Sequence, residues 1–104
     1  MSTDSAAHAD DRVHIHATVT GLVQGVGFRY FTVMTARDIG VGGWVRNCYD
    51  GSVEVDAQGT RAQIARLLSA LKAGPKWSRV EHVAVEQLPV NTDITAAFRV
   101  FQER

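Results

Sequence analysis

The sequence predicts a ferredoxin-like α+β sandwich, in the order βαββαβ plus a short C-terminal strand, with a mainly antiparallel sheet and two helices on one face. Three observations lead to this fold class. Apolar and polar residues alternate strictly over 13–20. A glycine-rich turn then leads into a helical pattern over 28–39. Two further strand patterns follow, and a second helical pattern starts after Thr60 and stops at Gly74.

The first strand is the clearest element. Every second residue from Val13 to Val19 is apolar, and the polar positions between and after them are His14, His16, Thr18 and Thr20. This period of two is typical of a strand with one buried face and one helix-free, solvated face. The helix over 28–39 carries apolar residues at helical spacing, and Gly40 ends it.

The remaining elements follow from turn and cap signals. Strands are predicted over 44–49 and 53–58, and Asp50-Gly51 between them predicts a hairpin with a tight primed turn. Thr60 to Gln63 has the form of a capping box and precedes the second helix. A fourth strand over 80–88 and a short fifth over 98–101 complete the sheet.

This element order fixes which loops are neighbours. In a split βαβ unit the first and second strands run parallel with the third inserted between them, and the crossover is right-handed. The C-terminal ends of the first two strands therefore share one edge of the sheet, with axes about 10 Å apart. The glycine-rich turn and the segment 44–50 meet at this edge, and a small anion fits between them.

Composition bounds the function classes. The 104 residues suit one domain over 12–104, preceded by a polar, acidic arm over 1–11 that we expect to be flexible. Eleven basic and eleven acidic residues leave no net field to attract nucleic acid or a membrane. The single cysteine excludes an internal disulfide. Without an apolar span or signal-peptide pattern, we expect a cytoplasmic monomer.

The loop between the first strand and first helix is the main candidate site. Its glycines leave successive N–H groups free to point inward, and a helix N-terminus favours an anion. Arg29 in the first turn costs roughly 0.3–1 kcal/mol unless an anion offsets it. Two interpretations stay open: an anion cradle, or glycines that serve turn geometry beside a solvated arginine. The cradle would use the backbone of Gln24, Gly25, Val26, Gly27 and Phe28.

Other candidate motifs are weaker. The loop matches neither the Walker phosphate loop, since no lysine follows, nor the dinucleotide fingerprint, since Tyr30 stands where the third glycine belongs. Cys48 has no evident basic partner and is predicted to be a small buried hydrophobe. His14 and His16 share a strand face but lack a third ligand, so no metal site is predicted.

Two long segments resemble the signatures of the acylphosphatase family. They are GLVQGVGFR at 21–29 and GWVRNCYDGSVE at 43–54, followed by AQG at 57–59. The resemblance extends over nearly all of 13–101. It implies hydrolysis of acyl phosphates to carboxylate and phosphate, without metal or cofactor. By motif position it assigns phosphate binding to Arg29 and orientation of the attacking water to Asn47, which sequence context alone would make an ordinary turn residue.

The implied chemistry suits so sparse a site. The leaving carboxylate has a conjugate acid with a pKa of about 4, so no enzyme acid is needed. Phosphoryl transfer depends mainly on positioning and fixed charge, which Arg29 and the loop amides can supply. Asn47 can donate to and accept from one water but cannot remove its proton. We therefore expect a substrate phosphoryl oxygen to take that proton.

Two other function classes compete with this one. An RNA-binding module of the same topology stacks bases on aromatics of the first and third strands, but here those positions are polar or acidic. A non-catalytic phosphate-binding or carbamoyl-phosphate-handling module, as found within larger hydrogenase-maturation proteins, is the alternative to an enzyme. Those proteins carry further domains with cysteine metal motifs, whereas this chain has one cysteine.

Overall fold

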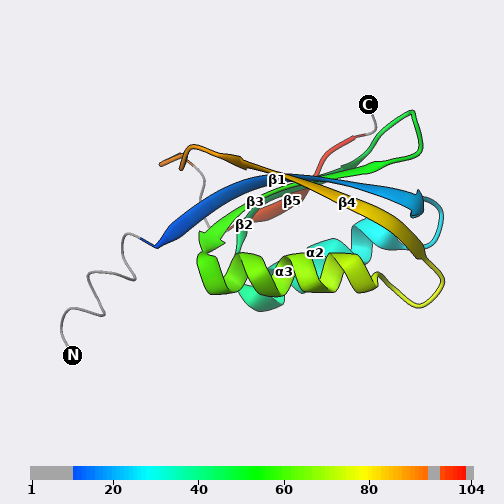
Figure 1. Cartoon of the computed structure of the whole chain (residues 1–104), viewed down its shortest axis with the longest axis horizontal. Helices are drawn as coiled ribbons and strands as arrows, with labels where there is room; N and C mark the ends of the chain where they lie inside the picture. The colour runs from blue at the N-terminus through cyan, green and yellow to red at the C-terminus, as the bar shows by residue number, and fades with distance from the viewer. Residues whose placement is uncertain (1–10, 94–96, 103–104) are drawn as a thin grey trace.

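The predicted elements form in the predicted order. The computed structural model describes residues 11–93 and 97–102, so all of the predicted arm except Asp11 lies outside the described residues. Figure 1 shows both helices on one face of the sheet. The elements are β1 (Arg12–Leu22), α2 (Phe28–Ile39), β2 (Gly42–Asn47), β3 (Val53–Thr60), α3 (Arg61–Ala73), β4 (Arg79–Leu88) and β5 (Phe98–Val100).

The sheet has the strand order β4-β1-β3-β2-β5. β3 pairs antiparallel with both β1 and β2, so β1 and β2 run parallel on either side of it. β4 pairs antiparallel with the outer edge of β1, and β5 adds a parallel strand beside β2. The predicted fold class and the shared edge of β1 and β2 are thereby confirmed. In Figure 1 the β1–α2 loop and the β2–β3 hairpin lie at the same end of the molecule.

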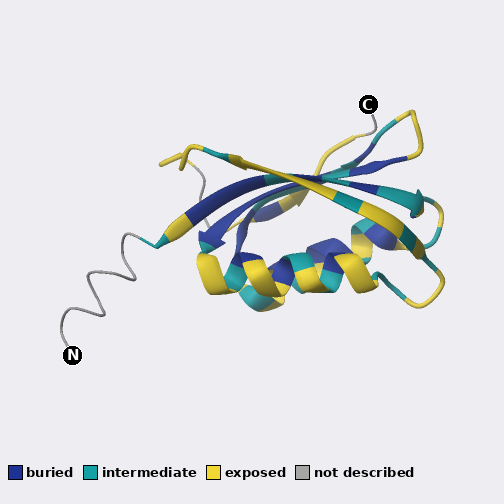
Figure 2. Ribbon diagram, viewed as in Figure 1, coloured by how far each residue is buried: buried dark blue, intermediate teal, exposed yellow. Residues whose placement is uncertain are grey.

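The core lies between the sheet and the two helices (Figure 2). The predicted inward positions of β1 are buried, and both helices turn apolar residues toward them. α3 begins with the predicted capping box, in which Thr60 accepts from Gln63 N–H and the Gln63 side chain accepts from Thr60 N–H. The buried helix residues are Phe28, Thr32, Val33 and Ala36 of α2 and Ile64, Leu67 and Leu71 of α3.

The β2–β3 hairpin is confirmed, but its predicted tight primed turn is wrong. Cys48 N–H donates to the Ser52 carbonyl (2.9 Å) and Gly51 N–H to the Cys48 carbonyl (3.1 Å), which closes a three-residue loop. Only Gly51 in this loop has positive φ, at +95°. The Asp50 carboxylate instead accepts from the Ser52 N–H (2.9 Å) and hydroxyl (2.6 Å). These two bonds favour the longer loop.

Strand β2 begins earlier than predicted, at Gly42, because glycines allow the strand to approach β3 closely. A Cβ atom on Gly43 would overlap the carbonyl of Asp56. The strand ends at Asn47 rather than at Tyr49, which is exposed in the hairpin loop. Among the described residues, no helix is long and apolar enough to cross a membrane.

Candidate active site

A small pocket lies at the edge where β1 and β2 end. Its volume is about 210 Å³, below the usual range for drug-sized ligand sites and sufficient for a phosphoryl group with a water. The structure thus brings the two sequence-predicted side chains, Arg29 and Asn47, to one pocket from different elements. The lining residues are Val23, Gly25, Gly27, Phe28, Arg29, Tyr30 and Asn47.

The loop wall of this pocket is a helix N-terminus without a cap. Gly25 and Gly27 have positive φ, +74° and +78°, and an added Cβ at either would meet no atom within 4 Å. The N-cap of α2 is Gly27, which has no side chain to cap the helix, and the first turn holds no acidic residue. Phe31 N–H donates to the Gly27 carbonyl (2.9 Å), so the N–H groups before it have no partner within the helix. This end of α2 therefore favours an anion.

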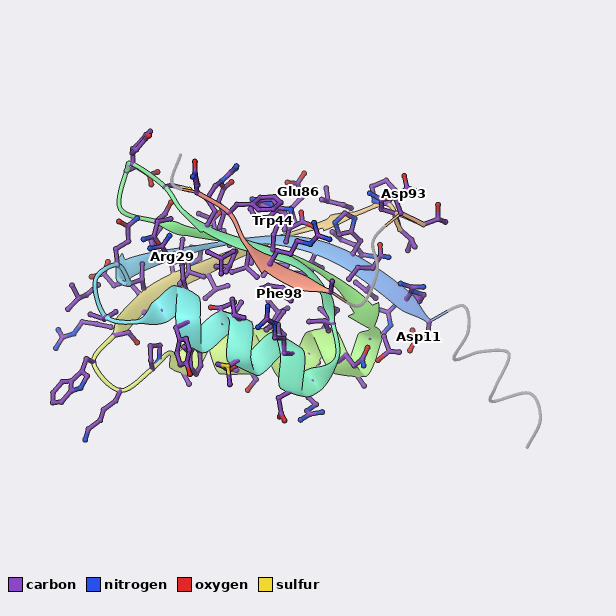
Figure 3. All side chains as sticks on the ribbon, turned by 180° about the vertical axis from the view of Figure 1, so that it is seen from behind. Asp11, Arg29, Trp44, Glu86, Asp93 and Phe98 are labelled. Carbon is purple, nitrogen blue, oxygen red and sulfur yellow. The ribbon has the colours of Figure 1, made fainter. Side chains whose placement is uncertain are left out.

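Arg29 projects from the first turn of α2 beside this loop. Figure 3 shows it at the end of the sheet opposite Asp11. Its side chain is half-buried, and it has no carboxylate partner among the described residues. A guanidinium that lines an uncapped helix N-terminus without a counter-ion is placed to receive a doubly charged anion.

Asn47 ends β2 on the other side of the pocket. The residue is 8% exposed, and its side-chain oxygen Oδ1 is buried without a hydrogen-bond partner in the described part of the chain. An unsatisfied buried acceptor costs about 1–3 kcal/mol, so such groups are normally bonded to water or ligand. The described residues therefore leave the accepting capacity of Oδ1 unused.

The predicted backbone donors divide into two groups. Gly25, Gly27 and Phe28 line the pocket, whereas Gln24 and Val26 do not. Val26 packs against the core. The Gln24 side chain turns to the hairpin, where its amide donates to the carbonyls of Cys48 (2.7 Å) and Ser52 (2.8 Å). The sequence predicts a role only for the backbone of Gln24, because side-chain bonds between loops carry no sequence signal.

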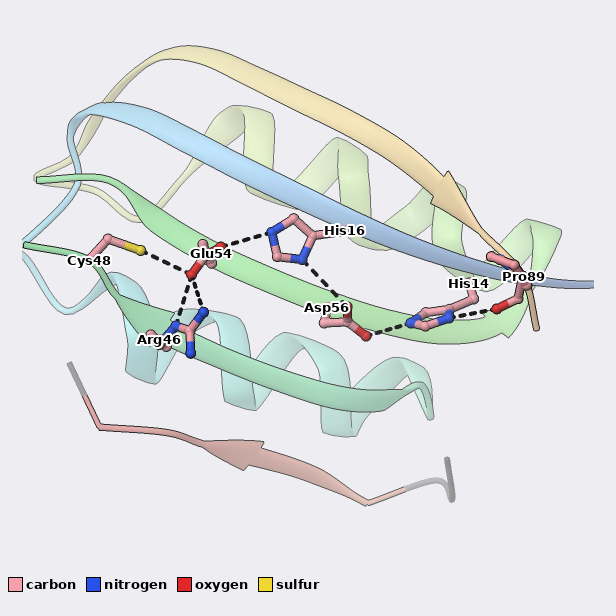
Figure 4. A network of polar contacts seen from close by, with 7 residues as sticks. All are labelled: His14, His16, Arg46, Cys48, Glu54, Asp56 and Pro89. Atoms are coloured by element: carbon pink, nitrogen blue, oxygen red, sulfur yellow. Dashed lines mark hydrogen bonds and ion pairs between the residues drawn. The ribbon is translucent and has the colours of Figure 1, made fainter. Parts of the chain in front are cut away.

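A polar network on the helix-free face reaches the residue after Asn47 (Figure 4). The Cys48 thiol donates to the Glu54 carboxylate (3.1 Å), which also binds Arg46 (2.6 Å) and His16 (3.0 Å). Cys48 is therefore not simply the predicted hydrophobe. Burial raises the pKa of the Cys48 thiol, and the bond to Glu54 raises it further, which disfavours a nucleophilic thiolate.

The predicted solvated face of β1 is correct only in part. His14 is 8% exposed and contacts both the Asp56 carboxylate (2.6 Å) and the Pro89 carbonyl (2.9 Å). Asp56 belongs to β3, and Pro89 directly follows β4. The sequence shows the polar face of each strand but not which residues pair across the sheet, so this network could not be predicted.

Replacing Glu54 by glutamine is expected to destabilise the fold near neutral pH. Burial would raise the pKa of Glu54, but hydrogen bonds from Cys48 and Arg46 outweigh it and hold the pKa below its usual range. Stability from this carboxylate is therefore present above the unfolded pKa of about 4.3 and lost as pH falls through the folded value. We expect Glu54→Gln to lose about 1–3 kcal/mol of unfolding free energy at pH 7 and less at pH 3, measured by urea denaturation.

The matched control for this prediction is Glu86→Gln, at an exposed position of β4. It should leave the unfolding free energy nearly unchanged at both pH values. Equal losses for Glu54→Gln at pH 7 and pH 3 would show that the stability does not come from the ionised carboxylate.

Comparison with known proteins adds independent information. The acylphosphatase family model matches residues 15–100. An acylphosphatase from Bifidobacterium longum (strain NCC 2705) is 57% identical over 90 residues, which are 86% of this chain and 93% of that protein. The solved structure of an acylphosphatase from Coxiella burnetii superimposes with a TM-score of 0.83 at 36% identity, covering 90% of this chain and 97% of that one.

A further structural match is to part of a larger protein. HypF from T. kodakarensis superimposes with a TM-score of 0.72 at 28% identity. The match covers 88% of this chain but 12% of HypF. A similar fold therefore occurs both in short chains and within a longer one.

Proposed function

Because the chain belongs to the acylphosphatase family and hydrolyses acyl phosphates to carboxylate and inorganic phosphate, we propose that Arg29 and Asn47 carry the reaction. One observation supports this most directly. The buried Oδ1 of Asn47 has no partner among the described residues, and Asn47 lines the same pocket as Arg29. An orphan acceptor on one side and an unpaired cation on the other suit a water and a phosphoryl group held together.

The phosphoryl group is bound by charge and by backbone donors. The Arg29 guanidinium offers a planar fork that matches two phosphoryl oxygens. The amides of the loop residues that line the pocket, Gly25, Gly27 and Phe28, bind the remaining oxygens, helped by the positive end of α2. Both elements are in place before substrate arrives, so they stabilise charge in the transition state with little reorganisation.

The attacking water is held by Asn47. The water donates one hydrogen to Oδ1 and can accept from the side-chain NH₂, which directs a lone pair toward phosphorus in line with the leaving oxygen. Asn47 has no basic group, so the proton of the water passes to a phosphoryl oxygen. The P–O bond to the acyl group breaks, and the carboxylate departs without protonation because its conjugate acid has a pKa of about 4.

The acyl part of the substrate is little constrained. The pocket is small, about 210 Å³, and Tyr30, which lines it, is 71% exposed. The acyl group therefore extends toward solvent. We propose that the enzyme accepts acyl phosphates of different size, which leaves recognition to the shared phosphoryl group.

Turnover is expected to survive a strong chelator. Arg29 supplies the positive charge that a metal would otherwise provide at the phosphoryl oxygens. Hydrolysis of benzoyl phosphate, followed by absorbance, should proceed at the same rate after dialysis against EDTA. Inhibition by EDTA that is reversed by adding Mg²⁺ or Zn²⁺ would refute the metal-independent mechanism.

A non-catalytic phosphate-binding or carbamoyl-phosphate-handling module is the alternative. The likeness to HypF favours it only weakly, because this chain covers 93% of its Bifidobacterium relative and 12% of HypF. Benzoyl phosphate hydrolysis also separates these functions, because a binding module would leave the substrate intact and an enzyme would hydrolyse it.

The remaining proposals concern setting and partners. The balanced charge supports a protein that binds a small acyl phosphate and neither nucleic acid nor a membrane surface. Trp44 does lie on the helix-free face, but it is stacked on Phe101 with ring centroids 5.2 Å apart, which leaves one fewer ring face for a base. We propose a cytoplasmic monomer with one domain over 12–104.

A further inference from the structure

The Gln24 side chain forms a bridge between the two loops of the site. Gln24 belongs to the glycine-rich loop, and its Nε2 donates to the Cys48 carbonyl (2.7 Å) and the Ser52 carbonyl (2.8 Å) of the hairpin. Both hydrogens of the amide are thus used on one partner loop. The side chain is partly buried and does not line the pocket, so it is not placed to contact the phosphoryl group.

The hairpin end of this bridge is the backbone that carries Asn47. Cys48 directly follows Asn47, and Cys48 N–H donates to the same Ser52 carbonyl (2.9 Å) that Gln24 contacts. Gln24 therefore holds both strands of the hairpin at their exit from the sheet. Among the described residues no hydrogen bond holds Asn47 Oδ1, so a shift of the hairpin backbone would move this atom without opposition from such a bond.

We propose that Gln24 is a positioning residue, which sets the distance between the water held by Asn47 and the phosphoryl group held by Arg29. This inference rests on the proposed function, because it requires Asn47 to hold the water. Strand pairing joins β2 to β3 and β5 but not to the glycine-rich loop. In the part of the chain that the structure describes, the two Gln24 bonds are the hydrogen bonds that link the loop to the hairpin. Misplacement of a reacting group by 1 Å can reduce a rate about 10²-fold.

Replacement of Gln24 by methionine tests the bridge. Methionine has similar length and no N–H donor, so Gln24→Met removes both hydrogen bonds while the loop backbone and Arg29 remain. We expect kcat for benzoyl phosphate to fall at least about tenfold, with inorganic phosphate affinity within about twofold of wild type. Wild-type kcat, or a phosphate affinity that falls as much as kcat, would overturn the proposal.

The matched control is another glutamine whose amide donates to a backbone carbonyl. Gln63 lies at the start of α3, away from the pocket, and its Nε2 donates to the Ile39 carbonyl (3.1 Å). Gln63→Met should lower the thermal midpoint and leave kcat unchanged at a temperature where the protein is folded. A kcat loss equal to that of Gln24→Met would show that general loosening explains both, and the positioning role would then be wrong.

A second variant gives a readout that loss of stability alone would not produce. In Gln24→Glu an ionised carboxylate faces two carbonyl oxygens and repels both, whereas the protonated form can donate one hydrogen bond. The kcat of Gln24→Glu relative to wild type should therefore rise as pH falls toward the glutamate pKa of about 4.3, and that of Gln24→Met should stay flat. A flat ratio for Gln24→Glu would contradict the bridge.

Failure of this inference is distinguishable from failure of the proposed function. If Asn47→Ala keeps wild-type turnover, the proposed function is wrong, and Gln24 has no water to position. If Asn47→Ala is inactive and Gln24→Met has wild-type kcat, only the Gln24 inference fails. Low kcat in both, with phosphate binding retained in both, supports the two together.

Discussion

Replacement of Arg29 by glutamine should abolish turnover, with a loss of at least about 10³-fold in kcat/KM, and should weaken phosphate binding. The physical reason is that Arg29 has no carboxylate partner among the described residues and lines the pocket, so its charge remains available for the substrate. Glutamine keeps much of the length and removes both the charge and the fork of donors. Benzoyl phosphate hydrolysis and calorimetric titration with inorganic phosphate measure the two effects.

Two companion variants sharpen this experiment. Arg29→Lys keeps the charge without the planar fork and should recover only part of the phosphate affinity. Arg66→Gln, at an exposed position of α3, makes the same substitution away from the pocket and should retain full turnover. Near-normal turnover in Arg29→Gln would remove Arg29 from the mechanism.

The free protein gives a further check on Arg29. A cation in the first turn of α2 opposes the helix dipole, so Arg29→Gln should leave the phosphate-free protein equally stable or more stable by about 0.3–1 kcal/mol. Added phosphate should raise the thermal midpoint of wild type more than that of the variant. A large loss of stability in the phosphate-free variant would instead point to a structural role.

The fold could be predicted because local and topological signals agree. Alternation in β1, the capping box at Thr60 and the glycine after α2 each define an element from neighbouring residues. The split βαβ order then allows few arrangements, which is why the meeting of Arg29 and Asn47 at one edge follows from topology alone. Their roles came from the family likeness and remain proposals.

What the sequence could not provide are contacts between residues far apart in the chain. Gln24 reaches Cys48 and Ser52, and His14 reaches Asp56 and Pro89, through side chains whose partners depend on exact register. The predicted type of the hairpin turn was wrong for a related reason. Asp-Gly is compatible with more than one turn type, and the bonds from Ser52 to the Asp50 carboxylate favour the three-residue loop. Side-chain hydrogen bonds of this kind have no periodicity to detect.

Replacement of Asn47 by alanine should abolish turnover while inorganic phosphate still binds. Alanine removes the side-chain contact proposed for the attacking water, and misplacement of a reacting group by 1 Å can reduce a rate about 10²-fold. Arg29 and the loop amides are unchanged, so phosphate affinity should stay within a few fold of wild type. Single-turnover hydrolysis of benzoyl phosphate and calorimetric titration with phosphate separate the two quantities, and loss of phosphate binding would contradict the water-holding role.

The comparison of Asn47→Ala with Asn47→Asp identifies which part of the amide matters. Aspartate keeps an acceptor for the water but places a negative charge in the pocket that Arg29 lines. It should therefore weaken both phosphate binding and turnover, whereas alanine should weaken turnover alone.

The control is Asn91→Ala. The Asn91 side chain accepts from Asp93 N–H (2.9 Å) and does not line the pocket, so this variant should stay active. Because alanine also removes the unsatisfied Oδ1, Asn47→Ala should be at least as stable as wild type, which would make the loss of turnover a loss of chemistry and not of fold.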